Sequence, residues 1–479
     1  MAGTGGGDVR IVVIGAGVGG LTAAARLAAL GHRVTVFEAA GTVGGKLGRY
    51  DRDGHVFDTG PSLLTLPQLF TDLDLDLVPL DPVVRHVFAD GVTLDSSSSH
   101  PEFLARIAAA LGPSAADDWD RLWRRAARIW DASWRSVLQR PVDTPLALAG
   151  LAWRLGDLAA IAPGLTLRGL GRRYLRDPRL RTLLDRYATY TGADPRRAPA
   201  ALAAIPYAEL NFGGWYVRGG LRAIADALLE RCRSLGVHVE LGAPVRAVTV
   251  TGGRATGVVL ASGAAVACDA VVSNVDALTL YRDLLPTPGR LAGLAARSLA
   301  GFVLLLGVRG ATPELAHHTV FFPRDYDAEF DAVFGGRPPA DPTVFVTRAD
   351  DPAVAPPGHE SWFVLVNAPR HGRAPSAVDW ERPGLADAYR DRVLDVLAAR
   401  GLDVRSRLTF AETRTPAWLA AETLSPGGAI YGTAGGLLRP PNRGPVPGLF
   451  LVGGSTHPGG GLPMVTLSAA IVADRIGPA

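Results

Sequence analysis

The chain is short of several residue types, and each shortage narrows what the protein can be. Only two cysteines occur in 479 residues, Cys232 and Cys268, and their spacing fits neither a disulfide framework nor a metal site. We therefore expect a reduced, cytoplasmic compartment and no bound metal. Lys46 is the single lysine, so arginine supplies the rest of the 49 basic residues. The net charge of +3 is too close to zero to indicate a nucleic-acid partner.

Long hydrophobic runs are also missing. The longest nearly unbroken apolar stretch, residues 299–308, has about half of the ~20 residues that a bilayer-spanning helix needs. A strand-like run already begins at Ile11, so we expect no cleaved secretory signal. Any contact with a membrane is therefore expected from one side, at its inner face.

What the chain does contain is typical of a folded, loop-rich globular protein. Hydrophobic residues make up 48% of it, and 57 glycines and 36 prolines interrupt the sequence. Because a single core stops growing near ~250–300 residues, we expect at least two domains.

The first 38 residues predict a strand, a helix and a second strand. Continuous apolar runs at 11–14 and 34–37 are typical of parallel strands buried on both faces, and residues 18–30 carry apolar residues at helical spacing. The end of the chain repeats this pattern, with a strand at 449–452, a glycine-rich loop and a helix at 464–476. We therefore expect both chain ends to build one domain around an inserted second one.

Between the two ends the pattern changes twice. Residues 100–200 predict helices. Strands are predicted at 237–241, 245–250, 255–260, 265–273, 303–306, 344–346 and 362–366, with hairpin turns at 252–254 and 262–263.

A dinucleotide fingerprint follows the first strand, in the run Gly15, Ala16, Gly17, Val18, Gly19 and Gly20. The first glycine of such a pattern makes a tight turn, the second lets the backbone approach a pyrophosphate, and the third allows close packing of helix on strand. Glu38 ends the second strand, where an acid accepts hydrogen bonds from ribose hydroxyls. A glycine-rich turn that binds nothing is the alternative, but the strand, helix and acid occur in the order that favours a dinucleotide.

Two further runs identify the dinucleotide by resemblance. One ends in Gly44, Gly45 and Lys46, and the other, residues 57–62, reads Phe-Asp-Thr-Gly-Pro-Ser. Together they resemble the second signature of the flavin-dependent amine oxidase and polyene desaturase superfamily, which usually has arginine where Lys46 stands. The resemblance implies that Lys46 neutralises the pyrophosphate, as a point charge without the fork of arginine.

The C-terminal run 448–465 resembles the final flavin motif of carotenoid desaturases of the phytoene desaturase type. In that family the loop and the start of the next helix lie against the ribityl chain and ring of the flavin. Segments 212–221, 242–245 and 270–276 resemble the same family. The implied cofactor is FAD, held by Gly15, Ala16, Gly17, Val18, Gly19, Gly20, Glu38, Gly45, Lys46, Gly60, Pro61, Ser62, Val245, Asn274, Gly453, Gly454, Leu462, Pro463, Met464 and Val465.

The expected fold is therefore α/β, with a Rossmann-like FAD-binding domain, an inserted mixed α+β substrate domain and a helical, membrane-facing subdomain. We assign residues 1–85, 221–290 and 425–479 to the FAD-binding domain. Residues 86–220 and 291–424 form the substrate domain, whose part at 100–200 is helical.

The resemblance implies an FAD-dependent oxidoreductase that removes hydride to the flavin N5 from a long apolar isoprenoid, such as phytoene or a later acyclic carotene. A flavin amine oxidase is one alternative, although that branch places a lysine near N5 and the single lysine here already follows the glycine pair. Another isoprenoid oxidase or isomerase and a flavin-free lipid carrier also remain open. The final electron acceptor is O2 or a membrane quinone.

Four side chains are candidates for catalysis. His457 and Thr456 belong to the flavin loop, although His457 can equally be a structural histidine. Glu209 and Arg218 flank the aromatic segment, where they could steer a carbocation-like intermediate.

The helical region is rich in arginine and tryptophan. From Arg121 to Arg186 there are fourteen arginines against five aspartates, and in or beside this stretch lie Trp119, Trp123, Trp130, Trp134 and Trp153. The first four tryptophans recur at 4, 7 and 4 residues, so they can share one helix face. That face either lies in an anionic membrane interface or belongs to a core with arginines on its outside, and the pattern leaves both open.

Overall fold

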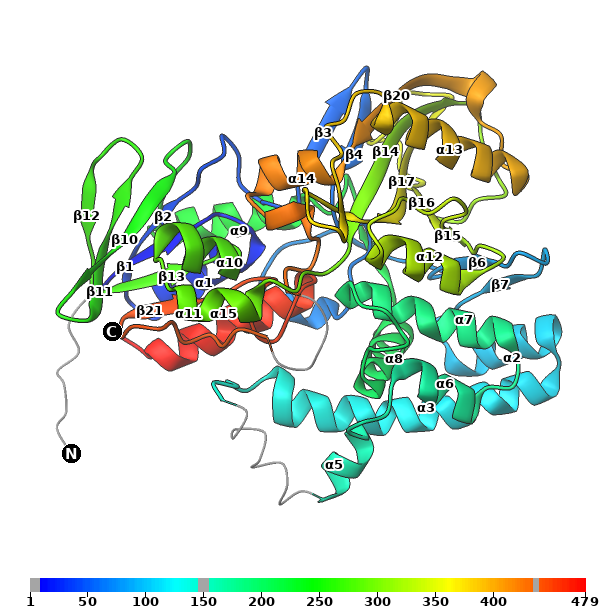
Figure 1. Cartoon of the computed structure of the whole chain (residues 1–479), viewed down its shortest axis with the longest axis horizontal. Helices are drawn as coiled ribbons and strands as arrows, with labels where there is room; N and C mark the ends of the chain where they lie inside the picture. The colour runs from blue at the N-terminus through cyan, green and yellow to red at the C-terminus, as the bar shows by residue number, and fades with distance from the viewer. Residues whose placement is uncertain (1–8, 145–154, 434–438) are drawn as a thin grey trace.

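The computed structural model describes residues 9–144, 155–433 and 439–479 (Figure 1). The nucleotide-type sheet occupies one end of the molecule, and a larger sheet and a group of helices lie side by side at the other end. The two termini of the described chain both belong to the first end.

Five parallel strands form the first sheet, in the order β21-β13-β1-β2-β9. They are β1 (Arg10–Ile14), β2 (Arg33–Phe37), β9 (His238–Glu240), β13 (Ala270–Ser273) and β21 (Leu449–Leu451). Helix α1 (Val18–Ala29) packs against both α9 (Ala223–Ser234) and α15 (Leu462–Ile476). The predicted strand–helix–strand unit is confirmed, and so is the return of the last strand to the same sheet.

The predicted hairpins form a separate antiparallel sheet of β10 (Val245–Thr251), β11 (Arg254–Leu260) and β12 (Ala265–Ala267). One prediction is wrong, because the expected single strand at 265–273 is two strands, β12 and β13. The strand is interrupted at Cys268 and Asp269, where the chain passes from the antiparallel sheet to the five-stranded parallel sheet. The Asp269 carboxylate accepts a hydrogen bond of 2.9 Å from the Arg10 backbone N–H, and this bond fixes the crossing to the start of β1.

The larger sheet has seven strands in the order β20-β14-β17-β16-β15-β6-β7, all antiparallel except the pair β15–β6. They are β6 (Arg85–Val87), β7 (Thr93–Asp95), β14 (Ala300–Arg309), β15 (His318–Phe321), β16 (Val344–Arg348), β17 (His359–Ala368) and β20 (Leu408–Arg414). Trp362 of β17 and Trp380 are buried in one apolar cluster with side chains of α13 (Leu385–Ala399). The sheet therefore has its own apolar core.

Smaller elements connect the layers. They include β3 (Arg49–Arg52), β4 (His55–Asp58), β5 (Leu77–Pro79), β8 (Trp215–Val217), β18 (Arg370–His371), β19 (Ala377–Val378), α10 (Ala277–Thr279), α11 (Pro288–Leu294), α12 (Tyr326–Phe334) and α14 (Pro416–Thr423). Because β6 begins at Arg85 and pairs with β15, the expected boundary after residue 85 falls inside a strand of the larger sheet.

The helical region consists of α2 (His100–Leu111), α3 (Pro113–Ser133), α5 (Leu155–Ile161), α6 (Leu167–Tyr174), α7 (Pro178–Arg186) and α8 (Ala204–Phe212). Trp119 and Trp130 of α3 are 1% and 7% exposed, and Trp123 and Trp134 pack against the same core. Trp130 also stacks on Trp134, with ring centroids 4.9 Å apart. Of the two interpretations of this helix face, the structure agrees with the core, because the rings hold α3 to its neighbours; Trp153 lies outside the described residues.

Within the described part of the chain, no helix combines the length and the apolar character that crossing a bilayer requires.

Candidate functional site

The fingerprint turn between β1 and α1 is built by close backbone contacts. Gly15 has a φ of +95°, and its N–H donates to the carbonyl oxygen of Phe37 at 2.8 Å. A Cβ atom on Gly20 would lie 2.0 Å from the Gly15 carbonyl oxygen, closer than any side chain allows. The sequence therefore has glycine at these positions because the backbone needs their space and conformations.

Three segments far apart in the sequence meet at this turn. A Cβ on Gly45 would lie 3.3 Å from the Cα of Gly17, and one on Gly19 would lie 3.2 Å from the Cα of Gly453. Asn274, which follows β13, touches Gly17, Gly19 and Gly453 with its side-chain amide. The fingerprint, the glycine pair and the C-terminal loop thus form one cradle of bare backbone at the N-terminus of α1, which fits the pyrophosphate of a dinucleotide.

Glu38 lies beside the cradle, at the end of β2. Its carboxylate accepts hydrogen bonds from the backbone N–H groups of Ala16 at 2.5 Å and Ala40 at 2.9 Å. The Ala243 N–H donates to the Glu38 carbonyl oxygen at 2.8 Å, which brings the start of β10 and Val245 to this edge. The residues expected at the adenosine end are therefore close together.

Lys46 leaves the glycine pair and turns toward the segment before the C-terminal loop. Its Nζ donates to the carbonyl oxygens of Ala429 and Ile430, each at 2.8 Å. Burial lowers the pKa of Lys46 to about 8, although the nearby carboxylate of Asp276 opposes the shift. Two of its three N–H groups are thus committed to backbone carbonyls.

The loop of Gly60, Pro61 and Ser62 packs directly on the Lys46 turn, since a Cβ on Gly60 would lie 1.8 Å from the Lys46 carbonyl oxygen. Just before it, the Asp58 carboxylate accepts hydrogen bonds from the N–H groups of Leu221 at 2.7 Å and Arg222 at 3.0 Å. Asp58 therefore anchors the chain that enters α9 to the second signature.

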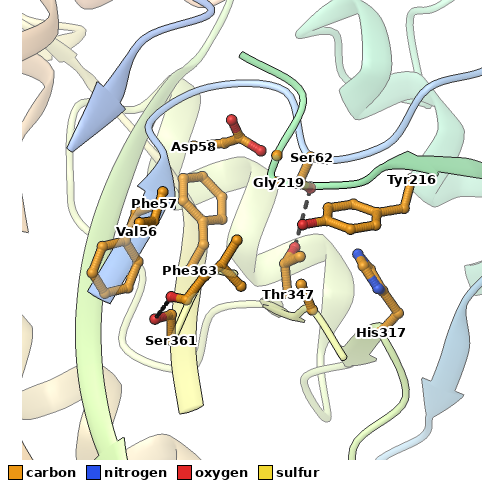
Figure 2. Close-up of a pocket in the computed structure, with 13 residues that line it drawn as sticks. Val56, Phe57, Asp58, Ser62, Tyr216, Gly219, His317, Thr347, Ser361 and Phe363 are labelled. Carbon is orange, nitrogen blue, oxygen red and sulfur yellow. Dashed lines mark hydrogen bonds between the residues drawn. The ribbon is translucent and has the colours of Figure 1, made fainter. Parts of the chain in front are cut away.

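Behind this loop lies a small cavity of about 40 Å³, shown in Figure 2. The Thr347 hydroxyl donates to the Ser62 hydroxyl at 3.1 Å across it, and Tyr216 and His317 line the same side. The Nε2 atom of His317 is buried and has no hydrogen-bond partner in the described ranges. A cavity of this size and polarity is suited to one or a few ordered waters.

The buried histidines make stability sensitive to acid. Burial lowers the pKa of His86 to about 3 and that of His317 to about 4, and lowers that of His318 as well. The unfolded chain takes up protons below pH ~6.5 that the folded chain does not bind, so His86 and His317 each lower the free energy of unfolding by about 2 kcal/mol by pH 5. Asp58 and Asp185 act oppositely, because burial raises the pKa of each to about 6. Each restores only about 1.3 kcal/mol at pH 5.

These four groups therefore lower the free energy of unfolding by about 1 kcal/mol between pH 7 and pH 5, and His318 adds to the fall. Urea titrations at pH 7, 6 and 5 measure it. The variant His317→Asn should show a shallower decline, and a stability that stayed constant or rose on acidification would contradict these assignments.

The C-terminal loop between β21 and α15 carries His457 and Thr456. The His457 ring is 1% exposed, and its Nε2 lies 2.9 Å from the Arg140 carbonyl oxygen and 3.0 Å from that of Val137. This geometry describes a structural histidine that ties the loop to the helical region. Thr456 is buried, and its hydroxyl has no partner in the part of the chain that the structure describes. Met464, in the first turn of α15, packs against the helical core.

The other two catalytic candidates differ sharply. Arg218 is exposed and pairs with Asp76 at the surface, at 2.9 Å. Glu209 is 1% exposed, and its two oxygens accept hydrogen bonds from the hydroxyls of Tyr187 at 2.8 Å and Tyr190 at 2.7 Å. Arg186 donates to the Tyr190 hydroxyl at 2.8 Å, so Glu209 belongs to a buried charged group that we call the tyrosine cluster: Arg186, Tyr187, Tyr190 and Glu209.

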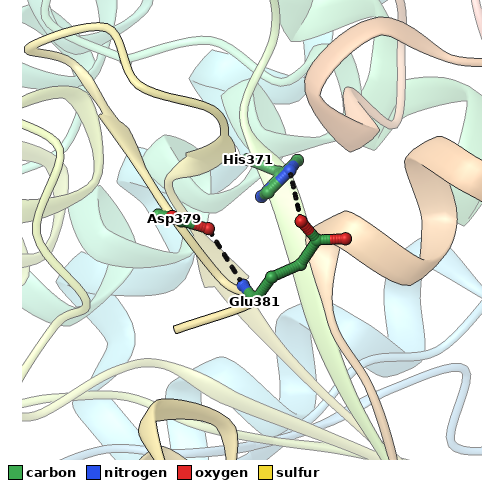
Figure 3. Close-up of side chains that lie close together, drawn as sticks. All are labelled: His371, Asp379 and Glu381. Carbon is green, nitrogen blue, oxygen red and sulfur yellow. Dashed lines mark hydrogen bonds and ion pairs between the residues drawn. The ribbon is translucent and has the colours of Figure 1, made fainter. Parts of the chain in front are cut away.

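Three residues with metal-ligating side chains come together elsewhere, at His371, Asp379 and Glu381 (Figure 3). The His371 Nδ1 accepts a hydrogen bond from the Trp380 N–H at 3.3 Å, and the Asp379 carboxylate accepts one from the Glu381 N–H at 3.2 Å. Both carboxylates are exposed. These hydrogen bonds explain why the three residues lie close together: they stabilise the chain that follows β18 and β19.

Sequence reasoning missed several residues that border the site. Tyr431 packs on the flavin loop, since a Cβ on Gly460 would lie 2.7 Å from its ring. Arg439 donates to the carbonyl oxygens of Tyr431 at 2.5 Å and Gly454 at 3.2 Å. Arg297 pairs with Asp276 in the interior. Nothing in one sequence distinguishes these arginines from the many others, because the contacts arise only in the folded chain.

Comparison with known proteins agrees with this geometry. The family model described as flavin containing amine oxidoreductase matches residues 18–477. A 4,4'-diapolycopene oxygenase of Methylomonas sp and a hydroxyneurosporene desaturase of Rhodobacter capsulatus are each 34% identical to the chain, and the alignments cover 98% of this chain and 98% and 99% of those proteins. The crystal structure of an oxidoreductase from Methanosarcina mazei has the same fold, with a TM-score of 0.64 at 18% identity over 97% of this chain and 100% of that one. The chain belongs to the flavin containing amine oxidoreductase family, and it is an FAD-dependent oxidoreductase.

Proposed function

We propose that this enzyme desaturates a long acyclic carotenoid. The observation that carries the proposal is the full-length likeness to a hydroxyneurosporene desaturase and a 4,4'-diapolycopene oxygenase, whose names each give a carotenoid as the substrate. The structure supports it with an apolar helical region beside the flavin loop, into which Met464 of α15 packs. An extended hydrocarbon needs such apolar surroundings.

Bound FAD supplies a hydride acceptor, and the chain supplies position, charge and exclusion of water. Loss of a hydride from an allylic carbon to this acceptor and of a proton from the neighbouring carbon to solvent would form one new double bond, and the two electrons leave with the hydride. Residues 453–464 and the Gly60 loop would hold the cofactor, and Met464 links the first of these segments to the helical core. The tyrosine cluster places the negative charge of Glu209 in that low-dielectric interior, where it stabilises positive charge on the polyene.

A flavin amine oxidase is the second candidate from the same family. That reading needs a lysine beside the flavin, whereas the Nζ of Lys46 donates to two backbone carbonyls. These contacts leave Lys46 without the role that an amine oxidase would require of it.

Product analysis tests the proposal. The purified enzyme is incubated with phytoene, a neurosporene-type carotene and a hydroxylated carotenoid in lipid vesicles, with an alkyl diamine as the comparison. A desaturase yields a red-shifted product that has lost two hydrogens, and an oxygenase yields one that has gained oxygen. Turnover of the amine alone would contradict the proposal.

We further propose that the enzyme meets its substrate at the inner face of a membrane, because a long carotenoid partitions into the bilayer. Exposed arginines of the helical region support this contact, among them Arg124 and Arg176, whose side chains are 72% and 70% exposed. Asp118 and Asp120 pair with them and reduce the attraction. Co-sedimentation with anionic vesicles at low salt should retain the protein in the pellet, and absence of binding would contradict docking.

The electron acceptor, O2 or a membrane quinone, is identified by a separate experiment. Turnover is measured in vesicles with and without quinone, under O2 or under argon.

A further inference from the structure

An unbalanced group of positive charges lies beside the nucleotide cradle. We call it the arginine cluster and define it as Lys46, Asp276, Arg297 and Arg439. Arg297 donates to the Asp276 carboxylate at 2.5 Å, and both side chains are almost fully buried, at 4% and 6% exposure. Asp276 is the only carboxylate, among the described residues, that acts on the pKa of Lys46 or Arg439. Three cations thus share one counter-ion.

Arg297 has donors that the protein leaves unused. Its Nη2 serves Asp276, but its Nε and Nη1 are buried and have no hydrogen-bond partner in the described ranges. An unmet donor on a buried charged group is costly, and proteins retain such groups where a ligand completes them. Burial and the neighbouring Arg297 also lower the pKa of Arg439 to about 10. The protein alone therefore compensates the charges of these buried arginines only in part.

Three of the segments that form the cradle also carry or contact the arginine cluster. Asp276 comes two residues after Asn274, which touches the fingerprint glycines. Lys46 directly follows Gly45, which packs on Gly17. Arg439 donates to the Gly454 carbonyl oxygen in the C-terminal loop. The uncompensated cations thus lie on, or in contact with, the segments that build the cradle.

We propose that Arg297 and Arg439, with Lys46, bind the pyrophosphate of FAD through charge. A pyrophosphate diester carries two negative charges. The arginine cluster has an excess of two positive charges, so the two would balance. The guanidinium groups would act in addition to the backbone N–H groups of the fingerprint, which carry no net charge. The inference rests on FAD as cofactor and is independent of the polyene, so its test succeeds or fails without any substrate.

Equilibrium titration of the apoprotein tests the proposal with two ligands. FAD carries the pyrophosphate and the flavin, and ADP-ribose carries the same pyrophosphate without the flavin. The variants Arg297→Gln and Arg439→Gln should each raise the Kd of both ligands by about 10- to 100-fold, as expected for the loss of a charged hydrogen bond. The matched control is Arg475→Gln, which removes an arginine from the far end of α15, where it pairs with Asp143. It should leave both Kd values within about twofold of the parental ones.

Other patterns overturn the proposal. If Arg297→Gln weakens FAD but not ADP-ribose, its charge serves the flavin ring and not the pyrophosphate. If neither ligand weakens, Arg297 serves only to hold Asp276. Should the variants fail to fold, the parental protein decides, because binding of ADP-ribose through three cations must weaken steeply as salt rises from low to high. An affinity that does not depend on salt contradicts the proposal.

Discussion

Replacement of Gly20 by alanine is expected to yield protein without FAD. The added Cβ would lie 2.0 Å from the Gly15 carbonyl oxygen and 3.1 Å from the Cβ of Asn274. The backbone must then shift by an ångström or more at the turn that receives the pyrophosphate, so α1 no longer presents its N–H groups there. We expect an FAD affinity at least about 100-fold lower, the order lost when several charged hydrogen bonds fail together. The flavin absorbance of the purified protein measures it.

Gly293→Ala is the matched control for this substitution. Gly293 is also a helical glycine, in α11, but a Cβ there would meet no atom within 4 Å. This variant should retain FAD as the parental protein does. A Gly20→Ala protein that kept its flavin would show that the cradle lies elsewhere.

Replacement of Glu209 by glutamine is expected to weaken both stability and reaction. The change removes the negative charge that faces Arg186 through Tyr190 in a fully buried position. An uncompensated buried guanidinium costs about 3 kcal/mol. Because the carboxylate also stabilises positive charge on the polyene, flavin reduction by the substrate should slow roughly 10- to 100-fold. Denaturant titration and anaerobic stopped-flow reduction measure the two effects separately.

Glu360→Gln separates the two effects. Glu360 is likewise buried, and it pairs with Arg348 at 3.2 Å and accepts from the Trp362 indole N–H at 2.8 Å within the larger sheet. This variant should lose stability to a similar extent and keep the parental rate of flavin reduction. If Glu209→Gln also kept that rate, the tyrosine cluster would have a structural role only.

The parts of the fold that a single sequence predicts are those with a strong local pattern. The apolar runs of β1, β2 and β21 and the turn at Gly252 and Gly253 need no distant partner to be identified. The glycines of the cradle can also be predicted from the sequence. The motif itself indicates where a tight turn or a close backbone approach leaves no room for a side chain. The Trp119 face of α3 could not be assigned from the sequence, because a helix face in a protein core and one in a membrane interface have the same spacing of tryptophans. The structure places this face in the core.

The rest depends on contacts across long separations in sequence. Asp276 meets Arg297, and the Gly454 carbonyl meets Arg439, only after three chain segments assemble around α1 and α15. Glu209 and His457 likewise could not be given roles before their partners were known. The hydrogen bonds of its ring nitrogen to backbone carbonyls identify His457 as a structural residue. The hydrogen bonds from two tyrosine hydroxyls show that Glu209 is buried and fixed in place.

The most direct test of the central claim is the absorbance of the bound flavin during anaerobic mixing with an acyclic carotenoid in vesicles. The account predicts that the oxidised flavin band bleaches as a red-shifted polyene appears, and that an alkyl diamine leaves the band unchanged. A flavin that the diamine bleaches and no carotenoid affects would contradict it.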